Sequence, residues 1–545
     1  MANGHRGRPA SATDAKAMPA PAAAPRHIPV LAIETATLAG LIALTALRLL
    51  VAGPAPLSAD EAYYWQWTRP LKLSYYDHPA MVAYWIRGGI AFLGDSPLGI
   101  RLPTVIASVV TTLLVWDATR VAFASRRAGA LAALWLNATL LFGAGAVIMT
   151  PDAPLLLFWS LALWALIRII ARGNDRAIFL VGLALGLGAI SKYTIALILP
   201  GIAVTFLLFP ALRPWGRRRD GWMAAALAMG CTTPLLLWNA LNHGASFAKQ
   251  LGHAFDSGRP DPLPNLAQFL GAETGLVTPL ILLFCLWGMG WALFEGWRRR
   301  RPEWFLLGAT SAPILIYFAW HTQSGVVQAH WAGPAYIAAV MAATGGWTSR
   351  DRARGAALFR WAPALGLAMT GIVYFQAATA WLPIPVKADA LKRLGGWDEL
   401  AAAVEMERTA HPGVFLFTQK HEPTGPVSFH LPDHPPVFLE GHIRPSYYTE
   451  AEVMALKGLT GLFITRSRDD GSADLPPFFD RITPLRSVDM HWGGRIADQY
   501  TLYLAEGYRG GLFVAGDGYD GTMDGPAPKS SDEPAPATDS PSPAP

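Results

Sequence analysis

The sequence predicts an α-helical polytopic membrane protein with about eleven transmembrane helices, interfacial helices in the first outer loop and a small α/β outer domain near the C-terminus. Hydrophobic residues make up 52% of the 545 positions and charged residues only 15%, and the mean hydropathy is +0.28. Apolar runs such as 28–51 and 151–170 are long enough, at ~20 residues, to cross a bilayer core of about 30 Å as helices. Short basic clusters separate the runs, which is typical of cytoplasmic loops.

The apolar spans can be placed in order along the chain. They are expected near residues 28–52, 103–124, 128–148, 152–171, 177–191, 195–212, 222–241, 267–295, 303–320, 331–348 and 357–382. Basic clusters occur at residues 6–26, 120–127, 168–176, 213–219, 298–301 and 350–354. All of these clusters fall on one side, so the positive-inside rule predicts a cytoplasmic N-terminus and an outer C-terminal region. The pair 177–191 and 195–212 also fits one kinked helix with a re-entrant turn.

Composition divides the chain into four parts. Residues 1–26 and 516–545 are rich in Ala and Pro and are expected to be disordered tails, the first of them cytoplasmic. The membrane domain is expected at residues 27–382, with the first outer loop at 53–102. Residues 383–515 mix alternating and helical patterns, which predicts an outer α/β domain. Its strands are expected near 414–417, 436–439, 462–465 and 500–504, and its helices near 388–406 and 449–457.

Several classes of function are disfavoured. The net charge of +5 does not indicate nucleic-acid binding, because the basic residues lie in short clusters between apolar spans. Cys231 and Cys285 both lie in apolar spans, so neither a disulfide framework nor a thiolate metal site is expected. Four histidines between residues 421 and 442 match no standard zinc spacing. No metal site is therefore assigned; a divalent ion is compatible with a carboxylate cluster but is not indicated.

The first outer loop carries the densest group of polar and aromatic residues. Asp60 and Glu61 directly follow the first span, and Ser58 with Glu61 forms a capping-box pattern, so both acids could simply start an interfacial helix. The loop then adds a second acidic and aromatic group before an amphipathic stretch at 81–92. Two such groups exceed what helix caps require. The candidates from this loop are Asp60, Glu61, Tyr63, Tyr64, Trp65, Asp77, His78 and Arg101.

Other outer segments supply further candidates. Asp152 begins the fourth span, where an acid also suits the helix dipole. Lys192 stands between two apolar runs, where a cation is costly unless it meets an anion. Glu273 is nearer the outer end of its span and could approach the same site. Three more residues are expected near the outer surface, namely Tyr193, Asn239 and His330, although a lone histidine there is more often structural.

These motifs, taken in order, resemble glycosyltransferase family 39 in its bacterial branch, which includes relatives of dolichyl-phosphate-mannose protein mannosyltransferases and of the aminoarabinose transferase acting on lipid A. The resemblance covers roughly residues 30–350. Each motif is short, but several occur in the family's order. The motifs are Asp60-Glu61-Ala-Tyr-Tyr-Trp, Tyr-Asp77-His78-Pro79, Arg101-Leu-Pro, Thr-Pro-Asp152, Ser-Lys192-Tyr and Leu-Trp238-Asn239. One departure is Ala80, where the family often has a second proline; this change affects loop stiffness more than chemistry.

The resemblance implies a membrane-embedded GT-C fold in the bacterial inner membrane that uses a polyprenyl-phosphate-linked sugar as donor. It implies that Asp60 is the catalytic base, that Asp152 lies close to the site and that Lys192 lies near the donor phosphate. The implied acceptor is a lipid- or glycan-linked group of the cell envelope, such as lipid A or lipopolysaccharide, and less readily a protein. No cofactor is required.

The chemistry agrees with these roles. An acceptor hydroxyl must lose a proton as it attacks the sugar, and a positioned carboxylate such as Asp60 can accept that proton. The leaving phosphate gathers negative charge, which Lys192 and Arg101 could stabilise. The tyrosines and Trp65 could either stack on sugar rings or anchor the loop at the lipid interface. Two alternatives stay open: a lipid or solute transporter that uses Asp60, Asp152 and Lys192 for coupling, and a non-catalytic envelope assembly protein. The absence of a convincing internal repeat disfavours a transporter.

Overall fold

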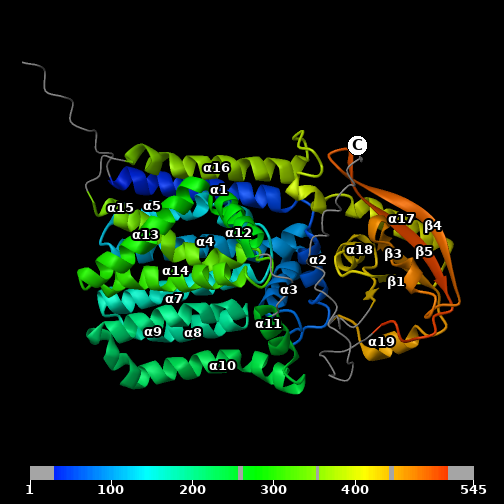
Figure 1. Ribbon diagram of the computed structural model, residues 1–545, viewed down its shortest axis with the longest axis horizontal. Coiled ribbons are helices and arrows are strands. Elements are labelled where there is room, and N and C mark those ends of the chain that lie inside the picture. The colour runs from blue at the N-terminus through cyan, green and yellow to red at the C-terminus, as the bar shows by residue number, and fades with distance from the viewer. Residues whose placement is uncertain (1–29, 256–261, 351–354, 441–446, 514–545) are drawn as a thin grey trace, which may run out of the picture.

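The computed structural model describes residues 30–255, 262–350, 355–440 and 447–513. The predicted tails at 1–26 and 516–545 and His442 lie outside this part of the chain. Figure 1 shows a bundle of long helices running side by side, with an α/β domain at one end of the bundle and the helices of the first loop between the two. This arrangement confirms the predicted fold class.

Seven helices of the described chain are long and apolar enough to cross a membrane. They are α1 (Val30–Ala52), α4 (Pro97–Ala122), α7 (Asp152–Arg172), α10 (Arg219–Leu241), α13 (Pro279–Arg298), α14 (Pro302–His321) and α16 (Ala356–Thr379). The pair Tyr193–Leu208 and Pro210–Arg217, bent by 113°, makes an eighth if it forms one span. Shorter helices complete the bundle: α5 (Arg126–Ala138), α6 (Leu140–Gly145), α8 (Ile178–Ala189), α9 (Leu199–Leu208) and α15 (Gly333–Thr348). The number of eleven spans stays a prediction.

Two predicted spans are interrupted. The span expected at 267–295 was wrong as one helix, because α12 (Pro262–Val277) ends before Thr278, whose φ of 71° leaves the right-handed helical region. Pro279 then starts α13, and a residue before proline disfavours helical geometry. The span expected at 128–148 breaks at Thr139, which has an extended backbone and caps α6 by accepting a hydrogen bond from the Phe142 N–H.

Small residues allow the membrane helices to approach closely. A Cβ atom added to Gly182 or Gly186 of α8 would lie 2.2 or 2.6 Å from the carbonyl oxygens of Ala224 and Ala228 in α10. This spacing of four residues puts both glycines on one helix face, as in other membrane helix pairs built on small residues. Together these contacts place the end of α8, which leads into Lys192, beside α10.

A buried arginine attaches α1 to the rest of the bundle. Arg48 is 1% exposed and donates hydrogen bonds to Ser108 Oγ at 3.2 Å, Asn137 Oδ1 at 2.9 Å and the Tyr374 hydroxyl at 3.4 Å. A cation at membrane depth is stable only with such partners. Arg48 therefore links α1 to α4, α5 and α16.

The first loop forms α2 (Ala59–Gln66) and α3 (Met81–Leu93), and the capping box of Ser58 and Glu61 is confirmed at the start of α2. A further short helix, α11 (Ala245–Phe255), follows α10. The α/β domain contains one five-stranded sheet in the order β2-β1-β3-β5-β4. Strands β1 (Phe415–Thr418), β2 (Val437–Leu439) and β3 (Gly461–Arg466) are parallel, and β4 (Arg481–Trp492) and β5 (Arg495–Glu506) form an antiparallel hairpin. Its helices are α17 (Trp397–Ala410), α18 (Thr424–His430) and α19 (Glu450–Ala455).

The α/β domain packs directly on the first loop. The Trp65 ring of α2 lies 5.1 Å from the Phe429 ring of α18. A Cβ atom at Gly425 would lie 2.5 Å from the backbone of Ala62, so only glycine permits this closeness of α18 to α2. The aromatic residues of the loop and one face of the sheet share a single apolar core. The domain therefore supports the loop that carries the candidate residues.

Candidate active site

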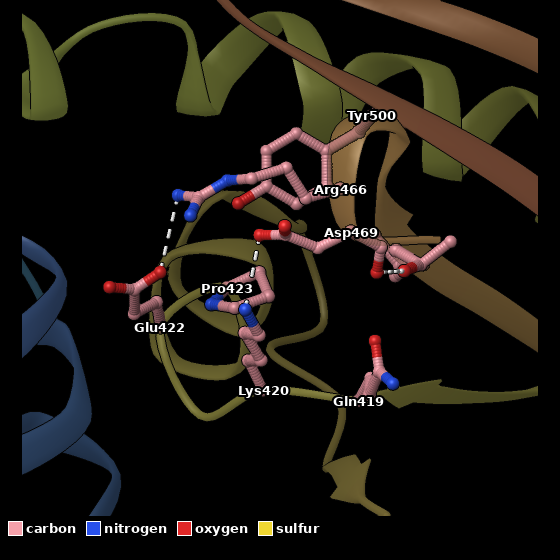
Figure 2. A pocket seen from close by; sticks show the side chains of 9 residues that line it. Gln419, Lys420, Glu422, Pro423, Arg466, Asp469 and Tyr500 are labelled. Atoms are coloured by element: carbon pink, nitrogen blue, oxygen red, sulfur yellow. Dashed lines mark hydrogen bonds and ion pairs between the residues drawn. The ribbon is translucent and has the colours of Figure 1, made fainter. Parts of the chain in front are cut away.

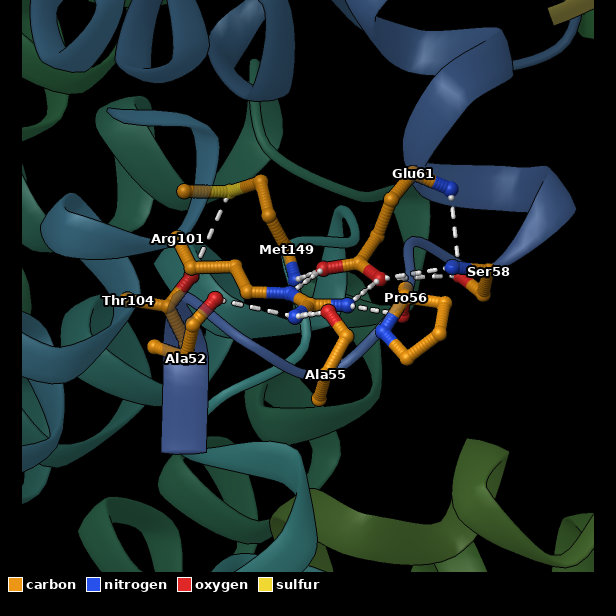
Figure 3. Close-up of polar contacts among 8 residues, drawn as sticks. All are labelled: Ala52, Ala55, Pro56, Ser58, Glu61, Arg101, Thr104 and Met149. Atoms are coloured by element: carbon orange, nitrogen blue, oxygen red, sulfur yellow. Dashed lines mark hydrogen bonds and ion pairs between the residues drawn. The ribbon is translucent and has the colours of Figure 1, made fainter. Parts of the chain in front are cut away.

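A buried ion pair connects the first loop to α4. Arg101 donates from Nε and Nη2 to the two carboxylate oxygens of Glu61, each at 2.7 Å (Figure 3). Its remaining N–H groups donate to the carbonyl oxygens of Ala52 at 3.0 Å, Ala55 at 2.7 Å and Pro56 at 2.8 Å. All five N–H donors of the guanidinium are thus used.

Glu61 has further partners at the same place. Its carboxylate accepts hydrogen bonds from the Ser58 N–H and the Met149 N–H, both at 3.0 Å. Burial would raise the pKa of Glu61, but the Arg101 guanidinium and these N–H groups outweigh it and hold the pKa below its usual range. Glu61 therefore stays ionised and attaches α2 to the segment that precedes Asp152.

This geometry gives two of the predicted site residues contacts other than the expected ones. Arg101 was expected to bind the donor phosphate, yet its donors are all committed to Glu61 and to backbone carbonyls. Glu61 was expected to be catalytic, yet it is fully buried in the same ion pair. We assign both residues to holding the first loop in position.

The second ion pair brings together residues from separate helices. Lys192, which precedes the short helix at Tyr193–Ile198, places its Nζ 2.8 and 2.9 Å from the two carboxylate oxygens of Asp152 at the start of α7. His330 Nε2 lies 3.9 Å from Asp152 Oδ2. Lys192 is only 8% exposed, and a cation buried in this way needs an anion beside it. Asp152 is that anion.

The second half of the first loop meets this pair. The Met81 N–H donates to the Ile190 carbonyl at 3.0 Å, which joins the start of α3 to the end of α8 just before Lys192. His78 and Asp77 precede Met81 by a few residues. This backbone hydrogen bond therefore places Asp77 and His78 near Lys192.

Asp77 is the centre of a third set of contacts. It accepts a hydrogen bond from the Tyr63 hydroxyl and forms an ion pair with Lys249 of α11. The Gln250 side chain donates to the Asp77 carbonyl at 3.0 Å. Burial would raise the pKa of Asp77, but Lys249 and Tyr63 hold it well below its usual range. Lys249 and Gln250 were not among the predicted residues; a lone lysine in an outer amphipathic helix is the only signal that the sequence offered.

His78 lies among both lysines and both aspartates. Burial, followed by the charge of Lys192, lowers the pKa of His78 to about 3, although Asp77 and Asp152 act in the opposite direction. The imidazole is therefore neutral near pH 7. Its Nδ1 is buried, and no described residue provides it with a hydrogen-bond partner.

The remaining candidates have different surroundings. The Tyr64 ring is 6.1 Å from the His78 ring, whereas Trp65 is buried and donates to Asp95 at 2.7 Å. Asp60 is exposed on the first turn of α2. Glu273 is buried in α12.

Two candidates hold α11 in place. The Tyr193 hydroxyl lies 2.7 Å from Ser246 Oγ, and Asn239 Oδ1 accepts a hydrogen bond from the Phe247 N–H at 3.2 Å. Both contacts attach the start of α11 to the bundle. Tyr193 and Asn239 thereby position Lys249 over Asp77.

A groove of about 410 Å³ opens between the first loop and the end of α10. Its walls come from the first loop, α3 and the end of α10, and they are mostly apolar. The lining residues are Leu71, Lys72, Leu73, Tyr84, Trp238, Leu241 and Asn242. In the described part of the chain, no group of three His, Cys, Asp or Glu residues is arranged to hold a metal.

Comparisons with known proteins agree with this architecture. The family model described as dolichyl-phosphate-mannose-protein mannosyltransferase matches residues 77–238. A lipid A galacturonosyltransferase from Rhizobium johnstonii is 28% identical over 289 residues, which are 52% of this chain and 59% of that protein. An undecaprenyl phosphate-alpha-4-amino-4-deoxy-L-arabinose arabinosyl transferase from Edwardsiella ictaluri is 27% identical over 286 residues, which are 48% of this chain and 49% of that protein. The matches thus span about half the length of these curated relatives.

A solved structure shares the fold. The crystal structure of ArnT from Cupriavidus metallidurans bound to undecaprenyl phosphate superposes with a TM-score of 0.60 at 15% identity. The superposition covers 86% of this chain and 98% of that chain. The two chains therefore agree in overall architecture.

The buried ion pair can be tested by Glu61→Gln. Removing one charge of a buried pair typically costs about 3–5 kcal/mol, because the other charge stays buried without compensation. We expect a clear fall in the midpoint of thermal unfolding of the detergent-solubilised protein. Glu506→Gln, in the exposed pair with Arg481, is the matched control and should leave the midpoint unchanged. A midpoint for Glu61→Gln equal to that of the control would contradict the structural role.

The depressed pKa of His78 predicts an acid sensitivity. The unfolded chain binds a proton at this residue near pH 6.5 but the folded chain only near pH 3, so stability falls as the pH drops through this window. Between pH 6.5 and pH 5 the loss from this one group is about 2 kcal/mol. We expect His78→Gln to remove that part of the pH dependence in denaturant unfolding. His243→Asn, at an exposed histidine with φ of 53°, serves as the control and should retain it.

Proposed function

We propose, from the premise that this chain is a glycosyltransferase family 39-like protein with the GT-C fold, that it transfers a sugar from a polyprenyl-phosphate-linked donor to a lipid- or glycan-linked acceptor of the cell envelope. Lipid A or lipopolysaccharide fits this role better than protein, because the relatives at 28% and 27% identity are named for lipid A or for a polyprenyl-phosphate-linked sugar. The observation that carries the proposal is the convergence of two lysine–aspartate pairs around His78.

The lysines provide the group that a phosphate leaving group needs. Lys192 and Lys249 come from separate elements and both act electrostatically on His78. Ammonium groups in a partly shielded site stabilise the charge that develops on a departing phosphate. In the resting protein Asp152 and Asp77 neutralise these lysines. The donor phosphate then takes up one or both ammonium groups in place of the aspartates.

Asp60 is the proposed general base. It is exposed, so an acceptor hydroxyl can reach it, and it belongs to the helix that Glu61 attaches to Arg101. A base on a rigid element keeps its position relative to the donor. In the proposed step the acceptor oxygen gives its proton to Asp60 and forms a bond to the sugar's anomeric carbon. The bond from that carbon to the phosphate oxygen breaks, and the electron pair leaves with the phosphate.

The polar end of the bundle is proposed to face the periplasm of a bacterial inner membrane. The basic clusters lie between spans on the opposite side, as expected for cytoplasmic loops. The mostly apolar groove beside Trp238 and Leu241 supports a place for the prenyl chain of the donor, because α10 lines it and also holds α11, which carries Lys249. No nucleotide is needed in this reaction.

The role of Asp60 is tested by Asp60→Asn in proteoliposomes that contain a radiolabelled polyprenyl-phosphate sugar and lipid A. We expect transfer to fall by about 10²–10⁴-fold with little change in donor binding, since a general base contributes that much. Asp398→Asn, which changes an exposed aspartate in the first turn of α17, is the matched control. Retained transfer by Asp60→Asn would remove it as base. Movement of label across the bilayer without covalent transfer would instead favour a transporter.

The role of the lysines is tested by Lys192→Ala and Lys249→Ala in the same assay. Each loses a charge-assisted contact to phosphate, typically worth about 1.5–3 kcal/mol, so kcat/KM for the donor should fall by roughly 10- to 150-fold. The KM for the acceptor should change little. Lys457→Ala, at an exposed lysine beyond α19, is the control. Donor binding that is unaltered in both variants would contradict the phosphate role.

A further inference from the structure

A polar crevice lies in the α/β domain (Figure 2). It is formed by the loop after β1, the end of β3 with the loop that follows it, and Tyr500 of β5. Lys420 and Glu422 come from the loop after β1, Arg466 is the last residue of β3, and Asp469 comes from the loop after β3. The open space within it is only about 10 Å³, enough for a water molecule, so a larger ligand enters only when the Asp469 and Glu422 carboxylates move aside.

The position of the crevice follows from the sheet topology. The chain passes from β1 through α18 to β2 on one side, and then through α19 to β3 on the other side of β1. The carboxyl ends of β1 and β3 are therefore a topological switch point, where the loops diverge. In open α/β sheets, ligands bind at such points.

Strands β1 and β3 are covered on both faces. Leu416 and Leu462 pack against α17 and α18 on one face. Phe417 and Phe463 pack into the core shared with the first loop on the other face. Polar residues of the parallel strands are thus concentrated at their ends.

Four charged side chains meet in the crevice. Lys420 Nζ lies 3.1 Å from Asp469 Oδ2, and Arg466 Nη2 lies 3.2 Å from Glu422 Oε2. Lys420 and Asp469 are 39% and 35% exposed, so their pair is weak and an incoming anion can replace the carboxylate. Arg466 is held more firmly, because its Nε also pairs with Asp498 at 2.8 Å.

The same loop reaches the proposed active site. The His421 ring lies 5.9 Å from the Tyr63 ring, and Tyr63 donates to Asp77. The carbonyl of Thr424 accepts a hydrogen bond from Gln66 of α2 at 3.5 Å. Lys420 is therefore adjacent in the chain to His421, which contacts Tyr63 of the first loop.

We propose that this crevice recognises an anionic sugar of the acceptor, with Lys420 and Arg466 binding its phosphate or carboxylate group in place of Asp469 and Glu422. That the sugar belongs to the acceptor rests on the proposed function, whereas its binding to the crevice does not. Guanidinium and ammonium groups suit such anions, and Gln419 and Thr465 supply further polar atoms for hydroxyl groups.

Saturation-transfer NMR on the full chain in nanodiscs tests the binding, with glucose 1-phosphate, glucuronate and glucose as probes. We expect at least one of the two anionic sugars to bind and glucose to bind much more weakly; the two anionic probes separate a phosphate from a carboxylate ligand. Lys420→Gln should weaken binding about ten-fold. Asp469→Asn should strengthen it about two- to five-fold, because it removes the competing carboxylate. A misfolded variant could not produce this gain.

Lys192→Ala separates the crevice from the proposed donor site. Binding that survives Lys192→Ala but is weakened by Lys420→Gln supports the crevice. Binding that is lost in Lys192→Ala and retained in Lys420→Gln overturns the proposal, as does equal binding of glucose or no binding of either anionic sugar. The two proposals can also fail separately. If the crevice binds an anionic sugar but the protein transfers no sugar from a polyprenyl-phosphate donor, the proposed function is wrong. The binding site then stands, and only the statement that the sugar belongs to the acceptor is withdrawn.

Discussion

The ion pair between Glu61 and Arg101 is the constraint on which the arrangement of the site depends. Removing two charges from water is costly, and the cost is offset here because the guanidinium has five acceptors and Glu61 accepts two further N–H groups. Because all of these hydrogen bonds must be kept, α2, α4 and the end of α1 can shift little relative to one another. The ion pair fixes the start of α2 relative to the end of α1, to α4 and to Met149. Asp60 precedes this anchor and Asp152 follows Met149, so both ends of the proposed site inherit its position.

A second, weaker set of contacts closes the site from the other side. The backbone hydrogen bond from Met81 to Ile190 aligns the first loop with the end of α8, and Tyr193 and Asn239 attach α11 above it. Lys249 can reach Asp77 only because all three elements meet. The α/β domain contributes through Gly425, which lets α18 pack against α2. The first loop is thus held between the membrane helices and the sheet.

The sequence predicted the parts of this arrangement that depend on local patterns. The capping box of Ser58 and Glu61, the helix at 81–92 and the need of Lys192 for an anion all follow from short-range chemistry. The pairing of Glu61 with Arg101, forty residues away, could not be predicted in this way. Glu61 also fitted the start of a helix, and Arg101 also fitted a phosphate ligand. Lys249 was missed since nothing near it in sequence shows that Asp77 lies beside it. Strand β4 was missed because most of its residues are exposed, so alternation of apolar residues is weak there.

The charge balance of the proposed site explains why its lysines are paired at rest. An isolated ammonium group at the membrane boundary is costly, so Lys192 and Lys249 fold against Asp152 and Asp77. The same burial keeps His78 neutral, so the cluster carries no net charge before substrate binds. Under the proposed function a donor phosphate must therefore exchange with an aspartate and cannot simply add to a cationic pocket. This exchange favours a ligand whose charge replaces the carboxylate. An uncharged sugar would find both ammonium groups already occupied.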